Sequence, residues 1–302
     1  EVALCTLSAV NLGALDSLDE LEDITEIIVR SLDCLLDYQD YPLKSAELTS
    51  NNRRTLGIGV TNLAYYLAKN DAKYSDGSGN ELIHKTFEAL QFYSLKASNK
   101  LAIEFGACPL FSETQYAQGI LPVDSYKKDI DVFCNTKLEL DWDSLRKDIK
   151  ASGLRNSTLT ALMPCESSSQ ISNSTNGIEP PRGFVSVKQS KDGILKQVVP
   201  EYEKLHKKYE LLWDIKDNEG YLQLCAIMQK FVDQSISTNT HYDPSKFEGN
   251  RVPMKLFLMD LLKAYKYGIK TLYYHTTRDG ASDDQSINNP NDDDCEDGVC
   301  KL

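Results

Sequence analysis

The sequence predicts an α/β fold. Segments with apolar residues every three to four positions, typical of amphipathic helices, alternate with short β-branched and apolar runs, typical of strands. The composition is globular, with 41% hydrophobic and 26% charged residues. The 302 residues suffice for one large domain or two ordinary ones. Because helices and strands alternate along the chain, a mixed architecture is favoured over separate helical and sheet domains.

Helices dominate the first half of the chain. Residues 17–38 place leucine and isoleucine on one face and acidic side chains on the other, which predicts an amphipathic helix. A longer helix is predicted over 81–105, followed by Gly106, a usual C-terminal residue. The other predicted elements are a strand at 2–7, a loop at 39–52, an apolar helix within 53–69, a turn at 74–80, irregular structure at 108–136, and a short helix from the capping Asp141 to Gly153.

Gly57 and Gly59 lie near the start of the segment 53–69. A GxG pair alone is a weak nucleotide-binding signal, and the third glycine of a dinucleotide fingerprint is absent. We interpret both glycines as positions where the backbone packs closely against a neighbour.

The stretch 153–182 contains the most informative local pattern. An apolar, β-branched run at 158–163 predicts a strand that leads through Pro164 into a helix, where Ser167 and Gln170 have capping-box spacing. The first N–H groups of a helix lack intrahelical partners and its dipole favours negative charge, so this turn is a candidate anion site. An ordinary serine-capped helix is the alternative, because such caps are commoner than phosphate sites.

The last third begins with a predicted hairpin. Lys191, Asp192 and Gly193 are typical turn residues between strands at 184–187 and 194–199. The remaining predicted elements are helices at 200–213, 221–236 and 254–267, the last ended by Gly268, then a strand at 269–274 and an acidic, disordered tail from Ser282 onward.

Charge and hydropathy exclude several functional classes. A net charge of -12 argues against a surface for duplex nucleic acid, which needs a basic face. No run approaches the roughly 18 apolar residues of a membrane span, and no signal segment opens the chain. The eight cysteines are scattered, unlike a disulfide framework. We therefore expect a cytoplasmic protein that binds neither nucleic acid nor membrane, and in which any redox pair is catalytic.

Long sequence blocks carry a family resemblance. They include ALCTLSAVNLG at the start, NRRTLGIGV, GLRNSTLTALMP, SSQISNSTNGIEPPRG, DQSIS, KTLYY and the CEDGVC tail. Over essentially its whole length, the chain resembles the C-terminal part of the large, catalytic subunit of class I ribonucleotide reductase. The resemblance implies the C-terminal half of a ten-stranded α/β barrel with helices outside, at 1–280, and a flexible acidic redox-shuttle tail at 281–302.

The resemblance also implies an activity, the radical-based reduction of ribonucleoside diphosphates to deoxyribonucleotides. In the family, the radical cysteine, the first reducing cysteine and the effector sites lie upstream of the segment that matches Glu1. We therefore expect one piece of a longer or split subunit, inactive without the N-terminal portion. No cofactor or metal is expected on this chain, since the radical comes from a metal-containing small subunit, and thioredoxin or glutaredoxin is the external reductant.

Two matches concern the active site. Cys5 matches the second member of the pair that reduces the substrate, whereas without the resemblance it would be interpreted as a small buried hydrophobic residue. The residues that match the family's substrate-phosphate loop are Pro164, Cys165, Glu166, Ser167 and Ser168. Some family members carry serine at the position of Cys165, so a hydroxyl contribution there is not expected in this chain.

Two adjacent tyrosines, Tyr273 and Tyr274, match a pair that relays the radical between subunits. Successive strand residues normally point to opposite faces, so stacking of the two rings requires a local departure from a regular strand. Two ordinary strand residues, one facing in and one facing out, are the alternative.

The tail cysteines Cys295 and Cys300 match the shuttle pair that regenerates the active site by thiol–disulfide exchange. A zinc site would need more ligands than these two thiols. The remaining cysteines have no matched role and are expected to be packing or surface residues: Cys34, Cys108, Cys134 and Cys225.

Two alternatives to the leading hypothesis differ in mechanism. A cobalamin-dependent relative is the nearest enzymatic alternative, but such an enzyme needs no relay from another subunit, and KTLYY therefore speaks against it. A non-catalytic assembly fragment that binds the small subunit or a nucleotide is the other alternative, and the missing radical cysteine supports it.

Overall fold

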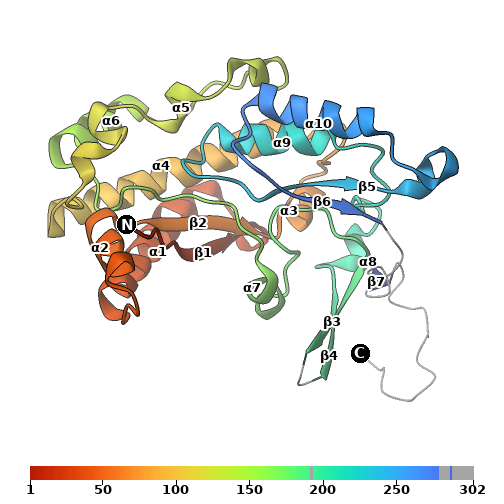
Figure 1. The fold of residues 1–302 in the computed structure, drawn as a ribbon, viewed down its shortest axis with the longest axis horizontal. Coiled ribbons are helices and arrows are strands. Elements are labelled where there is room, and N and C mark those ends of the chain that lie inside the picture. Colours follow the sequence, from red (N-terminus) through yellow and green to blue (C-terminus); the bar gives the residue numbers. More distant parts are fainter. Residues whose placement is uncertain (191–192, 279–285, 288–302) are drawn as a thin grey trace.

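The computed structural model describes residues 1–190, 193–278 and 286–287 (Figure 1). Its strands are β1 (Thr6–Asn11), β2 (Leu56–Thr61), β3 (Val185–Ser190), β4 (Gly193–Val198), β5 (Thr238–Tyr242), β6 (Leu272–Thr277) and β7 (Ser286–Ile287). Its α-helices are α1 (Leu21–Tyr38), α2 (Lys44–Arg53), α3 (Leu63–Lys69), α4 (Asn80–Phe105), α5 (Pro122–Ser125), α6 (Trp142–Ser152), α7 (Glu166–Ile171), α8 (Tyr202–Leu205), α9 (Glu219–Gln229) and α10 (Met254–Tyr267). The predicted mixture of helices and strands is confirmed.

Parallel strand pairing connects the two ends of the chain. β1 pairs with β2, and β5 pairs with β6, both in parallel. Parallel bridges from Ile58 to Thr160 and from Leu162 to Ile236 place the run 158–163 between β2 and the residues that lead into β5. The order across the molecule is therefore β1, β2, residues 158–163, β5 and β6. The described residues do not form a closed barrel.

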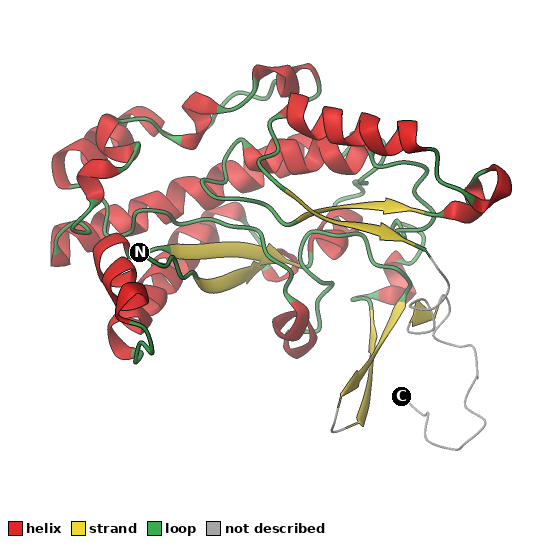
Figure 2. Cartoon of the chain, viewed as in Figure 1, coloured by secondary structure: helices red, strands yellow, loops and turns green. Residues whose placement is uncertain are grey.

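Helices supply most of the core around these strands. α1 packs on α4 and on β1 and β2, while α4 also contacts α6 and α9. α9 and α10 lie beside β5 and β6 (Figure 2), where the Phe257 ring of α10 meets the His275 ring of β6 at 4.5 Å. The largest fully buried side chains include Phe87 of α4 and Leu56 and Ile58 of β2. The central strands are thus held from the helical side by an apolar core.

Several predicted elements are confirmed, with small changes at their ends. The helices predicted at 17–38, 81–105 and 254–267 correspond to α1, α4 and α10. The helix that Asp141 caps is α6, and the Asp141 side chain accepts from the N–H of Ser144. The predicted hairpin is β3 and β4, which pair in an antiparallel register, while Lys191 and Asp192 lie outside the described residues.

The region between α1 and α3 differs from the prediction. The predicted loop at 39–52 contains α2, a helix without an apolar stripe, which periodicity could not reveal. The helix predicted within 53–69 is confirmed only as α3, because 56–61 form the strand β2, in which all six residues are buried. The two glycines make this possible, because a Cβ on Gly57 would lie 2.6 Å from Cys5 Sγ and one on Gly59 would lie 2.6 Å from Met163 Sδ. Their interpretation as close-packing positions is confirmed.

Predicted boundaries near the N-terminus and at 221–236 were also wrong. The strand expected at 2–7 is β1, which begins four residues later than expected, and the predicted helix ends at Gln229 rather than Ile236. The side chain of Gln229 donates to the carbonyls of Val232 and Gln234, which fixes a turn immediately after α9. The residues beyond this turn join the strands instead.

The segment 200–213 differs more from the prediction, since only α8, residues Tyr202–Leu205, is helical there. Glu201 has a left-handed backbone conformation, with φ of 49°. The N–H of Leu212 donates to the carbonyl of Pro181 rather than within a helix. The expected disordered tail also differs in part, because Ser286–Ile287 form β7 against β3, while the rest of 279–302 lies outside the described residues.

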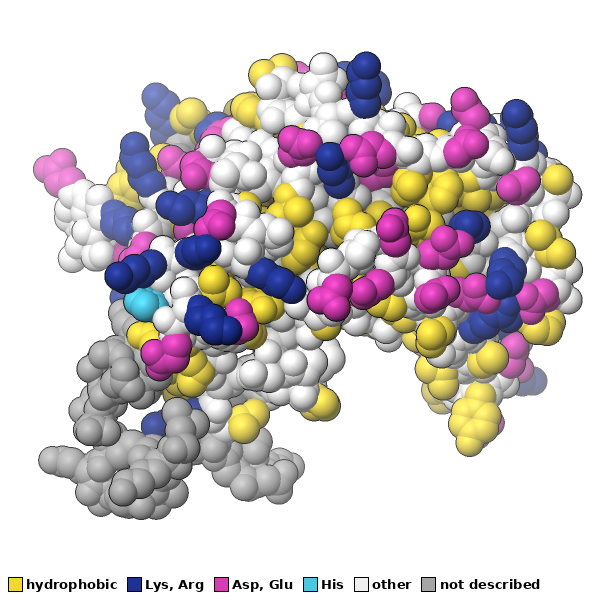
Figure 3. All heavy atoms as spheres, turned by 180° about the vertical axis from the view of Figure 1, so that it is seen from behind, with side chains coloured by type: hydrophobic (Ala, Val, Ile, Leu, Met, Phe, Trp, Pro, Cys, Tyr) yellow, Lys and Arg dark blue, Asp and Glu magenta, His cyan; other side chains and the backbone are white. Residues whose placement is uncertain are grey.

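The surface carries both charges and exposed apolar groups. On the face opposite to that of Figure 1, acidic, basic and hydrophobic side chains are interspersed (Figure 3). α10 exposes an unusual number of apolar side chains: Met254, Leu258, Met259, Leu261, Leu262 and Tyr265. Among the described residues, no helix has the length and apolarity required to cross a bilayer.

One buried histidine predicts a pH dependence of stability. His84 of α4 is fully buried against Phe231, and neither ring nitrogen has a hydrogen-bond partner among the described residues. Burial, followed by the nearby Lys230 charge, lowers its pKa to about 4. In the unfolded chain the imidazole takes up a proton near pH 6.5. The folded state is therefore expected to lose up to ~3 kcal/mol of stability as the pH falls from about 6.5 to 4.

Urea unfolding of His84→Leu at pH 7 and pH 4.5 measures this contribution. The variant should show a smaller loss of stability on acidification than the unmodified chain. His206→Leu, which removes a partly exposed histidine, is the matched control and should retain the full loss. An unchanged pH dependence in His84→Leu would contradict the assignment.

Candidate active site

Cys5 lies immediately before β1, opposite a glycine. Its Sγ packs over Gly57, where any Cβ would collide with the sulfur. The residue as a whole is exposed, so the interpretation as a buried hydrophobic side chain is not supported. Desolvation of the sulfur, followed by the negative charge of Asp233, raises the pKa of the thiol. Cys5 is therefore an exposed residue whose sulfur is partly desolvated and whose thiol is protonated at neutral pH.

The predicted phosphate loop follows the run 158–163 and leads into α7. Cys165 is buried, and its thiol donates to the carbonyls of Val60 and Met163 at 3.6 Å each. Burial raises the pKa of this thiol. The side chain at this position thus faces β2, so it packs against the strand whether or not the loop binds an anion.

The start of α7 is fixed differently from the prediction. Cys165 is the N-cap, and no side chain caps the helix, so the predicted capping box of Ser167 and Gln170 was wrong. Instead, Asn176 Oδ1 accepts from the Cys165 N–H at 2.7 Å, and Asn176 Nδ2 donates to Glu166 Oε1 at 3.0 Å. A residue eleven positions away replaces the local cap, which sequence spacing alone could not show.

A cavity of about 320 Å³ opens beside α7. Glu166 and Glu179 contribute carboxylates to its lining, Arg182 contributes a positive charge, and β3 and β4 form one wall. Of the predicted loop residues, Glu166 lines this cavity, whereas Pro164, Cys165, Ser167 and Ser168 are not among its described lining residues. The volume is within the range typical of small-molecule sites.

Tyr273 and Tyr274 stack on each other at the start of β6. Their ring centroids are 4.0 Å apart and their planes are inclined by 46°. The strand register explains the stacking, since Thr238 pairs with Leu272 and Thr240 with His275, so that two tyrosines oppose the single residue Asn239. This irregularity is a β-bulge, the local departure from a regular strand that stacking requires.

The tyrosine pair lies at the surface. Tyr273 is 51% and Tyr274 58% exposed. A hydrogen bond with Tyr274 raises the pKa of the Tyr273 phenol. The two phenols are therefore both accessible from outside and linked to each other, which two independent strand residues would not be.

Three further residues, absent from the sequence predictions, connect the tyrosines to the cavity. Asn239 Oδ1 accepts from the Tyr274 N–H at 2.9 Å, and Asn239 Nδ2 donates to Glu179 Oε1 at 2.5 Å. His241 Nε2 lies 3.5 Å from the same carboxylate oxygen. Burial opposes ionisation of Glu179, but His241 and Asn239 stabilise the carboxylate and hold its pKa below the usual range. Polar residues within the β-type run 238–242 were the signal that could have identified Asn239 and His241.

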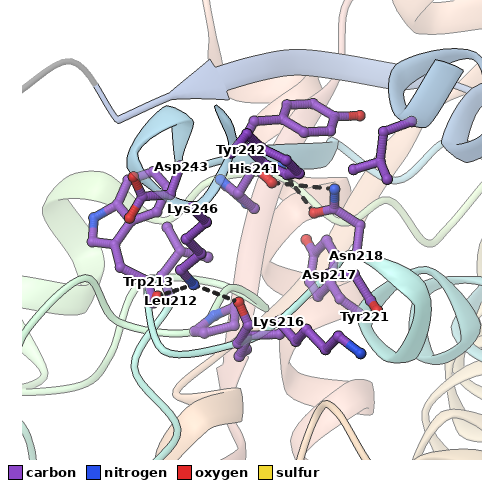
Figure 4. A pocket seen from close by; sticks show the side chains of 14 residues that line it. Leu212, Trp213, Lys216, Asp217, Asn218, Tyr221, His241, Tyr242, Asp243 and Lys246 are labelled. Atoms are coloured by element: carbon purple, nitrogen blue, oxygen red, sulfur yellow. Dashed lines mark hydrogen bonds between the residues drawn. The ribbon is translucent and has the colours of Figure 1, made fainter. Parts of the chain in front are cut away.

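A second, smaller pocket of about 30 Å³ lies behind His241 (Figure 4). Asn218 brackets the backbone of His241, since its Oδ1 accepts from the His241 N–H at 2.9 Å and its Nδ2 donates to the carbonyl at 3.2 Å. The ring of Trp213 meets the His241 ring edge-on at 6.2 Å. Because this pocket is too small for a nucleotide, we interpret it as packing around His241.

The structure brings parts of the predicted site together through neighbouring strands and through Asn239. Cys5 and the turn at Pro164 lie along the same neighbouring strands, because Gly57 packs against Cys5 and Gly59 packs against Met163. The tyrosine pair joins the cavity through Asn239 and Glu179. The predicted shuttle cysteines Cys295 and Cys300 lie outside the described residues.

Comparison with known proteins identifies the family. A family model described as the barrel domain of ribonucleotide reductase matches residues 1–275. The chain belongs to the ribonucleotide reductase family. The resemblance inferred from the sequence blocks is thereby confirmed, and the matched range contains the parallel strands β1, β2 and β5 and the first four residues of β6.

Similar ribonucleotide reductases are much longer than this chain. The ribonucleoside-diphosphate reductase subunit alpha of Haemophilus influenzae is 66% identical over 302 residues, which cover 100% of this chain and 40% of that protein. Subunit alpha of reductase 1 of Escherichia coli is 65% identical over 269 residues, or 88% of this chain and 35% of that protein. The subunit alpha of phage T4 is 51% identical over 307 residues, with coverages of 100% and 40%. The ribonucleotide reductase chain described here therefore spans 35–40% of these relatives.

Proposed function

We propose that this chain is part of a ribonucleoside-diphosphate reductase and takes part in the radical-based reduction of ribonucleoside diphosphates. The bulge that stacks Tyr273 on Tyr274 is the observation that carries the proposal. A phenol can lose an electron and a proton together, so two stacked and hydrogen-bonded phenols can pass a radical inward. An ordinary strand would place the rings on opposite faces.

Electrons for the reduction are assigned to cysteines. Cys5 and a second thiol in the N-terminal portion of the subunit would each give up a hydrogen and form a disulfide as the substrate loses its hydroxyl. Cys295 and Cys300 would then reduce that disulfide by exchange, and thioredoxin or glutaredoxin would reduce the tail pair. The exposed position of Cys5 supports its part in this sequence.

The substrate is assigned to the loop of Pro164, Cys165, Glu166, Ser167 and Ser168. The first N–H groups of α7 and its hydroxyl side chains can donate to diphosphate oxygens. The cavity beside α7 supports this assignment through Arg182, which adds a positive charge to its lining. The domains follow the same proposal, with half of a ten-stranded barrel at 1–280 and a redox-shuttle tail at 281–302.

Two protein partners are part of the proposal. The N-terminal portion of the subunit would supply the radical cysteine and the remaining barrel strands, and a small metal-containing subunit would generate the radical. The exposed apolar face of α10 supports a partner on the tyrosine side, because α10 packs directly on β6 and large exposed apolar patches mark interaction sites. A cytoplasmic location accords with reduced thiols.

The chain by itself is expected to show no nucleotide reduction, because the hydrogen-abstracting thiol is assigned to the N-terminal portion. Activity should appear when the chain is mixed with that portion and with the small subunit. Product formation by the isolated chain, measured as deoxyribonucleotide per chain, would contradict the proposal that the active site needs residues of the N-terminal portion.

Tyr273→Phe and Tyr274→Phe should each abolish turnover in the assembled enzyme while substrate affinity stays within about twofold, since only a transition-state requirement is lost. Phenylalanine keeps the ring but lacks the phenolic proton. Tyr38→Phe, at an 87% exposed tyrosine at the end of α1, is the matched control and should keep the normal rate. Normal turnover in either relay variant would refute the relay.

Cys5→Ser and the double variant Cys295→Ser/Cys300→Ser should fail differently. Loss of Cys5 removes an electron donor at the substrate, so even the first turnover of a pre-reduced enzyme should fail. Loss of the tail pair should allow one burst of product and then stop, and a small dithiol should restore cycling only in the tail variant. Cys34→Ser, at an exposed cysteine without an assigned role, should behave normally. Normal cycling of the tail variant with a protein reductant alone would remove Cys295 and Cys300 from the pathway.

A further inference from the structure

We infer that Asn239 is a positioning residue for the tyrosine pair, which it holds stacked by bonding at once to the Tyr274 backbone and to the anchored carboxylate of Glu179. The inference rests on the proposed relay for its functional consequence. Its structural content, that the amide of Asn239 maintains the stacking, can be tested without any turnover.

The bulge creates a specific need that Asn239 meets. Two residues, Tyr273 and Tyr274, occupy the space opposite one residue, so the ladder of backbone hydrogen bonds is interrupted there. A backbone N–H without a partner is unfavourable. Asn239 Oδ1 accepts from the Tyr274 N–H at 2.9 Å and thereby replaces the missing ladder bond. The bulge in β6 is therefore stabilised by a side chain of β5, the strand that pairs with it.

The other half of the same amide fixes the side chain in place. Asn239 is only 9% exposed, and its Nδ2 donates to Glu179 Oε1 at 2.5 Å. Hydrogen bonds to a charged acceptor are stronger than neutral ones, so this contact strongly limits rotation of the amide. The orientation that points Oδ1 toward the Tyr274 N–H is therefore set by the donor on the opposite side.

Glu179 also lies next to His241, whose backbone is fixed by Asn218. The imidazole Nε2 lies 3.5 Å from Glu179 Oε1, and the His241 side chain is 7% exposed. Both backbone polar groups of His241 bond to the side chain of Asn218 (Figure 4). Asn218 Nδ2 also donates to Asp260 of α10 at 2.9 Å. Hydrogen bonds thus connect the tyrosine pair through Asn239 to Glu179, which lies beside the residue that Asn218 links to α10.

Only a side chain with an acceptor and a donor at this distance satisfies both neighbours. Leucine has a similar size but neither group, which would leave the Tyr274 N–H and Glu179 without this partner. Aspartate keeps an acceptor but places a second negative charge against Glu179, which is unfavourable. In either case the strand is expected to return toward regular pairing, and the two rings would separate to opposite faces.

The test uses the full-length subunit that contains this chain, with 3-fluorotyrosine in place of Tyr273. The fluorine resonance reports the ring of Tyr274 stacked on it, which a reference sample with Tyr274→Leu calibrates. Asn239→Leu and Asn239→Asp should move the resonance toward that unstacked reference. The exchanged pair Asn239→Asp/Glu179→Gln restores one donor and one acceptor in reversed order and should return the resonance toward the native position.

Turnover is measured in parallel on the same variants, without the fluorine label and with the small subunit present. Asn239→Leu should lower kcat by at least about tenfold, as the loss of one or two buried hydrogen bonds implies, with KM nearly unchanged. The matched control is Asn99→Leu, because Asn99 is an equally buried amide that donates to the carbonyls of Asp148 and Gly153, far from β6 in the chain. It should lower stability but leave the fluorine signal in place.

Two results would overturn the inference. One is a native resonance in Asn239→Leu, and the other is an equal change in Asn99→Leu, which would indicate general destabilisation. Failure of the relay itself gives a different pattern, in which Tyr273→Phe keeps normal turnover while the resonance still depends on Asn239. The positioning role and the proposed function can therefore fail separately.

Discussion

The buried ion pair between Arg54 and Asp33 is the interaction on which the strand arrangement depends. Arg54 is 4% exposed and Asp33 5%, and Arg54 Nε donates to Asp33 Oδ1 at 2.7 Å. The same carboxylate accepts from Arg155 Nε at 3.1 Å and from Asn156 Nδ2 at 3.0 Å. One side chain of α1 therefore fixes the residues just before β2 and just before the run 158–163. Removing a single partner of such a buried pair leaves an uncompensated charge at a cost of about 3–5 kcal/mol.

The consequences run along the strands to the site. Once the starts of β2 and of the run 158–163 are fixed, Gly57 comes to lie against Cys5, and Gly59 against Met163 just before the loop. A second carboxylate, that of Asp233, joins the run 158–163 to the segment that leads into β5. It accepts from the N–H groups of Leu159 and Thr160 at 2.8 and 2.9 Å. The blocks NRRTLGIGV and GLRNSTLTALMP therefore carry mainly structural residues, and of the predicted site they contain only Pro164. The buried Asn156 also illustrates this, since its side chain is fully engaged in the network.

Features of the fold that depend on local sequence patterns could be predicted from the sequence. Periodicity and a following glycine were sufficient for α4 and α10, where Gly106 and Gly268 adopt positive φ values of 85° and 82°. Motif blocks were sufficient for the family, whereas the roles of Cys5 and of the tyrosine pair belong to the proposed function. The rest depended on residues distant in the sequence. Polar α2 lacks an apolar stripe, Asn176 replaces the expected cap of α7, and Asn239 meets Glu179 only after residues sixty positions apart come together.

Adjacency in the sequence does not by itself create a relay, as two tyrosine pairs of this chain demonstrate. Tyr65 and Tyr66 are neighbours on α3, where Tyr66 is buried and its hydroxyl bonds to Thr86 at 3.0 Å, so this pair serves packing. Tyr273 and Tyr274 are neighbours on a strand, where regular geometry would separate them. They stack because one strand is bulged and because the opposing strand supplies an amide that stabilises the bulge. The proposed chemistry therefore depends on a local irregularity in the sheet, and that irregularity depends on the polar residue that faces it.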